Sequence, residues 1–159
     1  MDLTTVNSLV DGNPSLLRRL ETKRVDEAGL RIQAARKHLA AAAELSRLNP
    51  NNSFNLIYDA AREVVEGALL TVGIRGRGCT DELLGVAVTT IFGDDFRDFD
   101  WIRRRRKENR YSSSMTRSVV HPEELNDARS STLTMCSHLQ ALIDVEPAID
   151  LSISGRNVP

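Results

Sequence analysis

The segment SFNLIYDAAREVVEGALLTVG, residues 53–73, decides the fold class. Apolar residues recur in it at steps of three and four, as expected for a helix with one buried face: Ile57, Ala61, Val64, Ala68 and Val72. Another face is polar, with Asn55, Asp59, Arg62, Glu63 and Glu66. Ser53 is placed to cap this helix and Gly73 to end it. The segment therefore predicts a long amphipathic helix.

The preceding segment, residues 25–48, is rich in alanine, the residue with the highest helix propensity. Its expected buried stripe comprises Leu30, Ala34, Ala41, Leu45 and Leu48. The NPNN sequence at 49–52 is expected to end this helix. Closer to the N-terminus, Pro14 and the leucines that follow it at helical spacing predict a short leading helix over 14–23.

The sequence GIRGRGC, residues 73–79, lacks the GK[ST] ending of a phosphate-binding P-loop and is expected to be a connecting loop. Thr80 is placed to begin a helix that runs to about Phe92. A further helix is expected over residues 95–111, followed by a flexible break at 112–118.

The sequence HPEE, residues 121–124, is typical of a helix start, because proline suits the first turn and acidic residues suit the positive end of the helix dipole. The expected core stripe of this last helix comprises Leu125, Ala128, Thr132, Met135, Leu139 and Leu142.

These elements predict an all-α fold, an up-and-down bundle of four main helices plus a short leading helix. No strand alternation and no internal repeat are apparent in the sequence. We expect residues 1–25 to form an N-terminal extension with the short helix, residues 26–145 the bundle, and residues 146–159 a flexible tail.

Composition excludes several classes of function. The 159 residues include 21 Lys+Arg and 22 Asp+Glu, a net charge of -1 that argues against a histone-like nucleic-acid binder. Aromatic residues make up only 4%, too few for rows of rings that stack on bases. The two cysteines and three histidines lack metal-ligand spacing, so we expect no metal and no cofactor. Without a secretory signal or an apolar run of membrane length, we expect a cytoplasmic protein with reduced thiols and no membrane association.

The run from Arg103 to Lys107 is the unusual feature of the sequence. Runs of charge usually lie on a solvated face. At about 100° per residue, however, Arg103, Arg106 and Arg110 continue the apolar side of their helix, whereas Trp101, Arg104 and Arg105 point elsewhere. That apolar side comprises Phe92, Phe96, Phe99 and Ile102.

A guanidinium on an apolar side needs a partner, because a buried unpaired charge is expensive. Two alternatives stay open from the residues alone. One is a structural ion pair with the carboxylates of Asp59, Glu63 or Glu66, and the other is a site for an anion such as phosphate.

Three segments together resemble HEPN (higher eukaryotes and prokaryotes nucleotide-binding) domains. They are FNLIYDAAREVVEGALLTVGIRGRGCTDELL at 54–84, FRDFDWIRRRRKENRY at 96–111 and HPEELNDARSS at 121–131. The resemblance is to a bacterial group with a "YDAAR…G" helix and a late "RxRRN…Y" segment. It covers residues 26–145.

Many HEPN domains are homodimeric, metal-independent endoribonucleases of the toxin or defence type, with an Arg followed after four to six residues by a His at a dimer cleft. The resemblance implies catalytic roles for Arg106 and, in place of the histidine, Tyr111. A tyrosine with a pKa near 10 suits hydrogen-bond donation to a phosphate better than general-base chemistry. The implied RNA- or phosphate-binding residues are Arg103, Lys107, Asn109 and Arg110.

Two functions follow from the resemblance. The first is an RNA- or nucleotide-directed homodimer that acts as a ribonuclease through the Arg-x4-Tyr motif. The second is a non-catalytic helical module that binds a protein partner, such as a nucleotidyltransferase or a toxin–antitoxin component. A helical structural subunit of an unrelated assembly is a third alternative.

Overall fold

A computed structural model describes the backbone of residues 3–111 and 119–145. The side chains of Leu3, Arg110 and Tyr111 are outside this description. Residues 112–118 and 146–159, expected to be a break and a tail, also lie outside the described residues.

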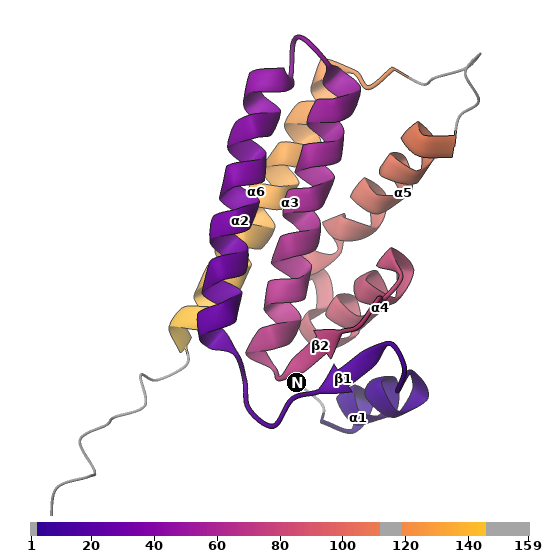
Figure 1. Ribbon diagram of the computed structural model, residues 1–159, viewed down its shortest axis with the longest axis vertical. Helices are drawn as coiled ribbons and strands as arrows, with labels where there is room; N and C mark the ends of the chain where they lie inside the picture. The colour runs from indigo at the N-terminus through magenta and orange to yellow at the C-terminus, as the bar shows by residue number, and fades with distance from the viewer. Residues whose placement is uncertain (1–2, 112–118, 146–159) are drawn as a thin grey trace, which may run out of the picture.

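Helices dominate the described part of the chain (Figure 1). In chain order the elements are α1 (Leu3–Gly12), β1 (Leu17–Arg19), α2 (Val25–Leu45), α3 (Pro50–Thr71), β2 (Ile74–Gly76), α4 (Asp81–Phe92), the 3-10 helix η1 (Gly93–Phe96), α5 (Asp98–Tyr111) and α6 (Pro122–Val145). The all-α bundle expected from the sequence is confirmed.

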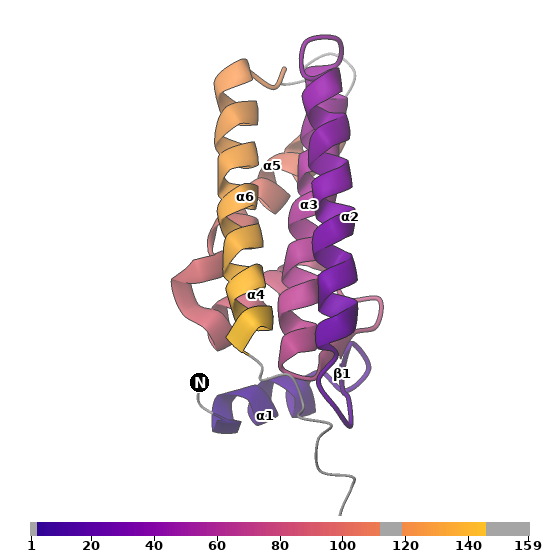
Figure 2. The ribbon, with the colours of Figure 1, turned by 90° about the vertical axis from the view of Figure 1, so that its left-hand side faces the viewer.

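Helix α3 is the centre of the bundle. It packs against α2 and α6 on one side, and α4 and α5 lie on its other side (Figures 1 and 2). It is buried around most of its circumference, since 13 of its 22 residues are buried. The expected positions Ile57, Ala61, Val64 and Ala68 are among them. Helix α5 runs in the opposite direction to α3 and is inclined to it (Figure 1), and Arg106 in its basic segment contacts Tyr58 of α3.

The start of α3 differs from the expectation. The helix begins at Pro50, and the side chain of Asn49 accepts a hydrogen bond from the backbone nitrogen of Asn52 at 3.1 Å. Ser53 is instead a buried residue whose hydroxyl donates to the carbonyl of Ala42 at 2.7 Å. The NPNN sequence therefore starts a helix, because Asn is a favoured cap and Pro fits the first helical position. Thr80 caps α4 as expected.

The buried stripe of α2 also differs from the expectation. The residues that face the core are Ala28, Ile32, Ala35, Leu39 and Ala42, whereas Leu30 and Leu48 are 63% and 84% exposed. Both stripes combine alanines with large apolar side chains at helical spacing, so the pattern alone does not choose between them. In α6 the expected stripe is confirmed from Leu125 to Leu139, with Leu142 partly buried.

The N-terminal region contains the largest correction. The leading helix spans residues 3–12, not 14–23, and Leu17–Arg19 is a strand. This strand pairs antiparallel with Ile74–Gly76, inside the expected loop, so the prediction of no strands was wrong. Strands of three residues are too short to show an alternation of polar and apolar residues. Gly73 and Gly78, at positive φ, flank β2 and provide the turns that reverse the chain there.

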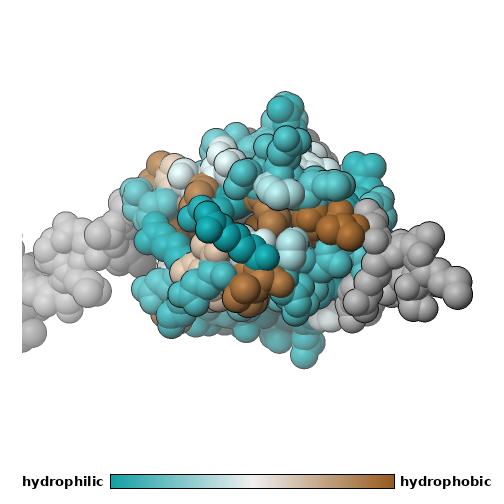
Figure 3. All heavy atoms as spheres, turned by 90° about the horizontal axis from the view of Figure 1, so that it is seen from above, coloured by the Kyte–Doolittle hydropathy of each residue, from teal (hydrophilic) through white to brown (hydrophobic). Residues whose placement is uncertain are grey.

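Within the described residues, no helix is long and apolar enough to cross a membrane. The end of the bundle formed by the α2–α3 turn and the start of α6 is mostly hydrophilic, with apolar residues between the polar ones (Figure 3). Leu48 and Val119, which are 84% and 60% exposed, belong to this end.

Candidate functional site

The apolar side of α5 anchors it against the bundle. Phe96, just before the helix, and Phe99 and Ile102 within it are at most 1% exposed, as the periodicity predicted. The ring of Phe99 stacks on that of Tyr58 in α3, with 6.3 Å between the ring centroids. This packing fixes the rotation of α5 and so decides which arginines face α3.

Arg106 is held against α3 but is weakly neutralised. Its guanidinium carbon lies 4.2 Å from the centroid of the Tyr58 ring, a cation–π geometry, and its side chain is 20% exposed. One terminal nitrogen lies 4.0 Å from Oδ1 of Asp59, the limit of an ion pair. Its Nε is buried and has no hydrogen-bond partner among the described residues. The guanidinium is therefore oriented while retaining donor capacity.

Tyr58 provides a neutral surface for this guanidinium. Burial raises the pKa of Tyr58 above its ordinary value, and a hydrogen bond with Asp81 raises it further, against smaller opposite effects of Arg62 and Arg106. The phenol therefore stays protonated over the physiological pH range. Arg106 consequently contacts an uncharged ring and has Asp59 as its nearest carboxylate.

Arg103 is paired more completely. Its Nη2 lies 2.5 Å from Oδ1 of Asp100, and its Nη1 lies 3.2 Å from Oε1 of Glu82. The side chain is 16% exposed. Lys107 is 65% exposed, with Nζ 3.8 Å from the same Glu82 oxygen. Arg104 is 64% exposed and pairs with Asp100. The structure thus places these three cations within one network of carboxylates from α4 and α5.

Arg105, expected to point elsewhere than the apolar side of α5, faces α6. Its side chain is only 11% exposed, and Nε donates to Oε1 of Glu124 at 2.7 Å. Nη1 donates to Oδ1 of Asn109 at 2.9 Å, which leaves the buried Nδ2 of Asn109 without an acceptor among the described residues. Glu124 lies on α6, so no helical spacing within α5 could reveal this partner.

The expected carboxylate partners separate into two groups. Asp59 is the one that faces Arg106, whereas Glu63 and Glu66 lie 2.7 and 3.0 Å from Arg31 of α2. Arg110 and Tyr111 are the last residues of α5, and their side chains lie outside the described residues. Of the predicted catalytic pair, the structure therefore describes the side chain of Arg106 and not that of Tyr111.

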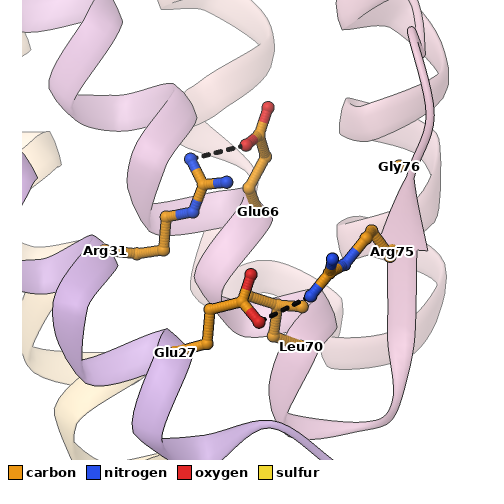
Figure 4. Close-up of a pocket in the computed structure, with 6 residues that line it drawn as sticks. All are labelled: Glu27, Arg31, Glu66, Leu70, Arg75 and Gly76. Carbon is orange, nitrogen blue, oxygen red and sulfur yellow. Dashed lines mark hydrogen bonds and ion pairs between the residues drawn. The ribbon is translucent and has the colours of Figure 1, made fainter. Parts of the chain in front are cut away.

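A shallow pocket of about 90 Å³ lies between α2, the end of α3 and β2 (Figure 4). Arg31 and Arg75 point into it from opposite sides, each toward a carboxylate, Glu66 and Glu27 respectively (Figure 4). Every charged group that lines this pocket is paired, so the pocket has less capacity for an ionic ligand than the surroundings of Arg106.

We define the α3–α5 seam as Arg106 of α5 with Tyr58 and Asp59 of α3, which it contacts, together with Asn55 and Asn109, each three residues along its own helix from this contact. Three of its buried polar atoms have no hydrogen-bond partner among the described residues: Oδ1 of Asn55, Nε of Arg106 and Nδ2 of Asn109. Two of the three are donors. An added group with acceptor oxygens, such as phosphate or carboxylate, would accept hydrogen bonds from these two donors.

Metal chemistry finds no support in the described residues, which contain no cluster of three His, Cys, Asp or Glu side chains able to hold an ion. Both cysteines are free and buried, and burial raises the pKa of each thiol.

Comparison of the chain with models of protein families, with curated proteins and with solved structures finds no match.

Proposed function

We propose that this chain is a HEPN-like, RNA-directed protein in which Arg106 contacts a phosphate group of the RNA. The supporting observation is the state of Arg106, which is positioned by the Tyr58 ring, has its nearest carboxylate at 4.0 Å and keeps a buried Nε without an acceptor among the described residues. A guanidinium fork matches phosphate oxygens, and here no strong ion pair has to break before it binds.

The cleavage reaction in this proposal needs no metal and no cofactor. The 2′-oxygen bonds to the adjoining phosphorus and the bond from phosphorus to the 5′-oxygen breaks, which gives a 2′,3′-cyclic phosphate and a free 5′-hydroxyl. Water takes up the proton of the 2′-hydroxyl and protonates the departing 5′-oxygen. Arg106 stabilises the negative charge on the phosphate, and Tyr111 donates a hydrogen bond to it. Two copies of the motif meet at the cleft of a cytoplasmic homodimer. Sedimentation velocity of the purified chain tests the dimer, and a monomer at every accessible concentration would contradict it.

Inducible expression with RNA integrity as the readout tests the site. Wild type is compared with Arg106→Ala and Tyr111→Phe, and we expect growth arrest with RNA loss only in wild type. Arg104→Ala is the matched control, because it removes the same charge from the same helix at a position that is 64% exposed. This control should act like wild type. Equal RNA loss in wild type and Arg106→Ala would reject the assignment.

A second function, a non-catalytic module that binds a nucleotidyltransferase or a toxin–antitoxin component, is favoured by a different observation. Arg103 and Arg105, the least exposed arginines of the basic run, are ion-paired with carboxylates of α4, α5 and α6. In this function the basic run stabilises the bundle and leaves RNA unbound. Capture of one specific protein partner, with no effect on RNA across a pH series, would favour it.

A further inference from the structure

The two-stranded ribbon concentrates positive charge. Residues 13–24 and 73–80, which contain β1, β2 and their flanks, hold six basic residues and one acidic residue, in a chain with a net charge of -1. The basic residues are Arg18, Arg19, Lys23, Arg24, Arg75 and Arg77, and the acidic residue is Glu21. We call this region the basic ribbon. Four of the basic residues lie in 13–24 and two in 73–80, and strand pairing brings these two distant segments together.

Strand pairing aligns three of these arginines on one side. Arg18 lies directly opposite Arg75 in the antiparallel register. The pairing continues for one more residue, since the backbone nitrogen of Arg77 donates to the carbonyl of Leu16 at 2.8 Å. Alternation along β2 therefore puts Arg77 on the same side as Arg75. Like charges directly opposite each other destabilise a strand pair, so this arrangement is not explained by stability.

Few carboxylates neutralise this side. Arg75 and Arg24 share Glu27, at 2.5 and 3.5 Å, and Figure 4 shows Arg75 reaching across to that residue. Arg18 and Arg77 are exposed, and neither has an ion pair in the described part of the chain. This side of the ribbon thus presents two solvated guanidinium groups, those of Arg18 and Arg77. A third, that of Arg75, lies on the same side and is paired with Glu27.

We propose that the basic ribbon binds the sugar–phosphate backbone of RNA, with Arg18 and Arg77 contacting phosphate groups. Guanidinium groups match phosphate geometry, and the strand register places Arg18 and Arg77 on the same side of the ribbon. The ribbon and α5 lie on the same side of the α2–α3 hairpin, with α4 between them (Figure 1). This inference shares with the proposed function the assumption of an RNA ligand, but it depends on different residues.

An anionic membrane fits the ribbon less well. Peripheral membrane binding combines basic residues with apolar side chains that enter the lipid. The exposed large apolar residues in the described part of the chain all lie elsewhere: Leu30, Leu48, Val86, Val119, Leu133 and Val145. The ribbon therefore has the charge for a polyanion without the anchors for a bilayer.

Fluorescence anisotropy with a labelled poly-uridine RNA at increasing salt tests the proposal. We expect the Arg18→Ala/Arg77→Ala variant to bind about tenfold more weakly, and the slope of log K against log salt to fall by about 1.4, the value for two single-strand phosphate contacts. Arg36→Ala/Arg47→Ala is the control, because it removes two exposed arginines from α2 and the turn after it. Equal weakening in both variants would overturn the proposal, since only net charge would then matter.

Three further ligands identify the class of polyanion. A DNA oligomer of matched length, poly-glutamate and vesicles containing phosphatidylserine are titrated under the same conditions. Tighter binding of wild type to poly-glutamate or to vesicles than to RNA would overturn the proposal. Equal binding of DNA would support backbone recognition while rejecting selectivity for RNA.

Arg106→Ala in the same titration separates the two proposals. If it binds RNA like wild type while Arg18→Ala/Arg77→Ala does not, the ribbon stands and the site at Arg106 fails. If only Arg106→Ala weakens binding, the ribbon proposal fails and the proposed function stands. Thermal unfolding of each variant establishes that it is folded.

Discussion

At Gly67, α3 lies in close contact with both α2 and α6. A β-carbon built there would lie 2.7 Å from Cδ2 of Leu139 in α6 and 3.2 Å from Cβ of Arg31 in α2. Leu139 is fully buried, so it has no space into which to withdraw. Gly67 has a helical backbone that any residue could adopt. Glycine is therefore required here for close packing and not for its conformational freedom.

Gly67→Ala should therefore destabilise the fold. We expect the free energy of unfolding to fall by about 1–2 kcal/mol through overpacking, measured from the urea midpoint at constant m-value. Gly29→Ala is the matched control, since it is also a helical glycine but has no atom within 4 Å of its β-carbon position. That substitution should raise stability by up to about 1 kcal/mol through helix propensity. Equal effects in both variants would contradict the packing argument.

The candidate site also shows which side-chain positions can be predicted from the sequence. Arg106 was placed correctly on the inner side of its helix, because that placement needs only the helical repeat and the apolar residues beside it. The partner of Arg105 could not be predicted in this way, because Glu124 lies 19 residues away on another helix. Tyr58, which supports Arg106, was part of the YDAAR sequence that carries the resemblance, but nothing in the sequence indicated its contact with Arg106.

At the scale of elements, Arg105 and Glu124 link α5 to the first turn of α6. Glu124 accepts hydrogen bonds from Arg105 at 2.7 and 3.2 Å and from the backbone nitrogen of His121 at 2.8 Å. The latter is one half of a capping box, and it confirms the expected role of His121 at the helix start. The hydrogen bond from Arg105, and to a smaller extent that from His121, lowers the pKa of Glu124.

This link should make stability depend on pH. Because the pKa of Glu124 is lower in the folded state, its stabilisation is present above the ordinary glutamate pKa of about 4.3 and is lost as pH falls through the folded-state pKa. Glu124→Gln should reduce the free energy of unfolding by about 1 kcal/mol at neutral pH, a value that allows for its partial exposure.

The control for this experiment is Glu123→Gln, an exposed residue in the same helical turn. Urea unfolding at a series of pH values should show the deficit of Glu124→Gln shrinking in acid, while Glu123→Gln stays close to wild type throughout. A deficit of Glu124→Gln that is independent of pH would contradict the argument.

The elements that could be predicted from sequence are those with local signals. Helices α3, α4 and α6 have clear periodicity, and the cap of α4 was identified at Thr80. The buried face of α2 could not be read because alanine suits both faces. The strands could not be read because their pairing is a contact between residues 17–19 and 74–76, which no local pattern encodes.

At the scale of the whole molecule, the N-terminal residues belong to the same core as the bundle. Val6, Val10 and Leu17 are buried within one apolar cluster with residues of the long helices. Leu17 is 1% exposed, and its partner strand contributes Ile74, which is fully buried. The segment expected to be an extension thus covers one end of the bundle.

Removal of residues 1–20 should consequently lower stability well beyond the effect of losing a tail. Burial of three large apolar side chains contributes about 1.5–3 kcal/mol each as an upper range, so we expect a loss of at least about 3 kcal/mol in chemical unfolding. Full-length Ser8→Ala/Asp11→Ala, altered at exposed positions of α1, should retain wild-type stability. A truncated chain as stable as wild type would show that the segment only rests on the surface.

The pairing of Arg19 with Ile74 across 55 positions also sets an order for biosynthesis. The first strand leaves the ribosome long before its partner has been translated, and the α2–α3 hairpin between them is made of contacts close in sequence, which form fastest. In the nascent chain, β1 and its arginines therefore remain unpaired until the α2–α3 hairpin has folded and β2 has been translated. Strand pairing thus becomes possible only after the hairpin and β2 have been translated, and α4, α5 and α6 are translated later still.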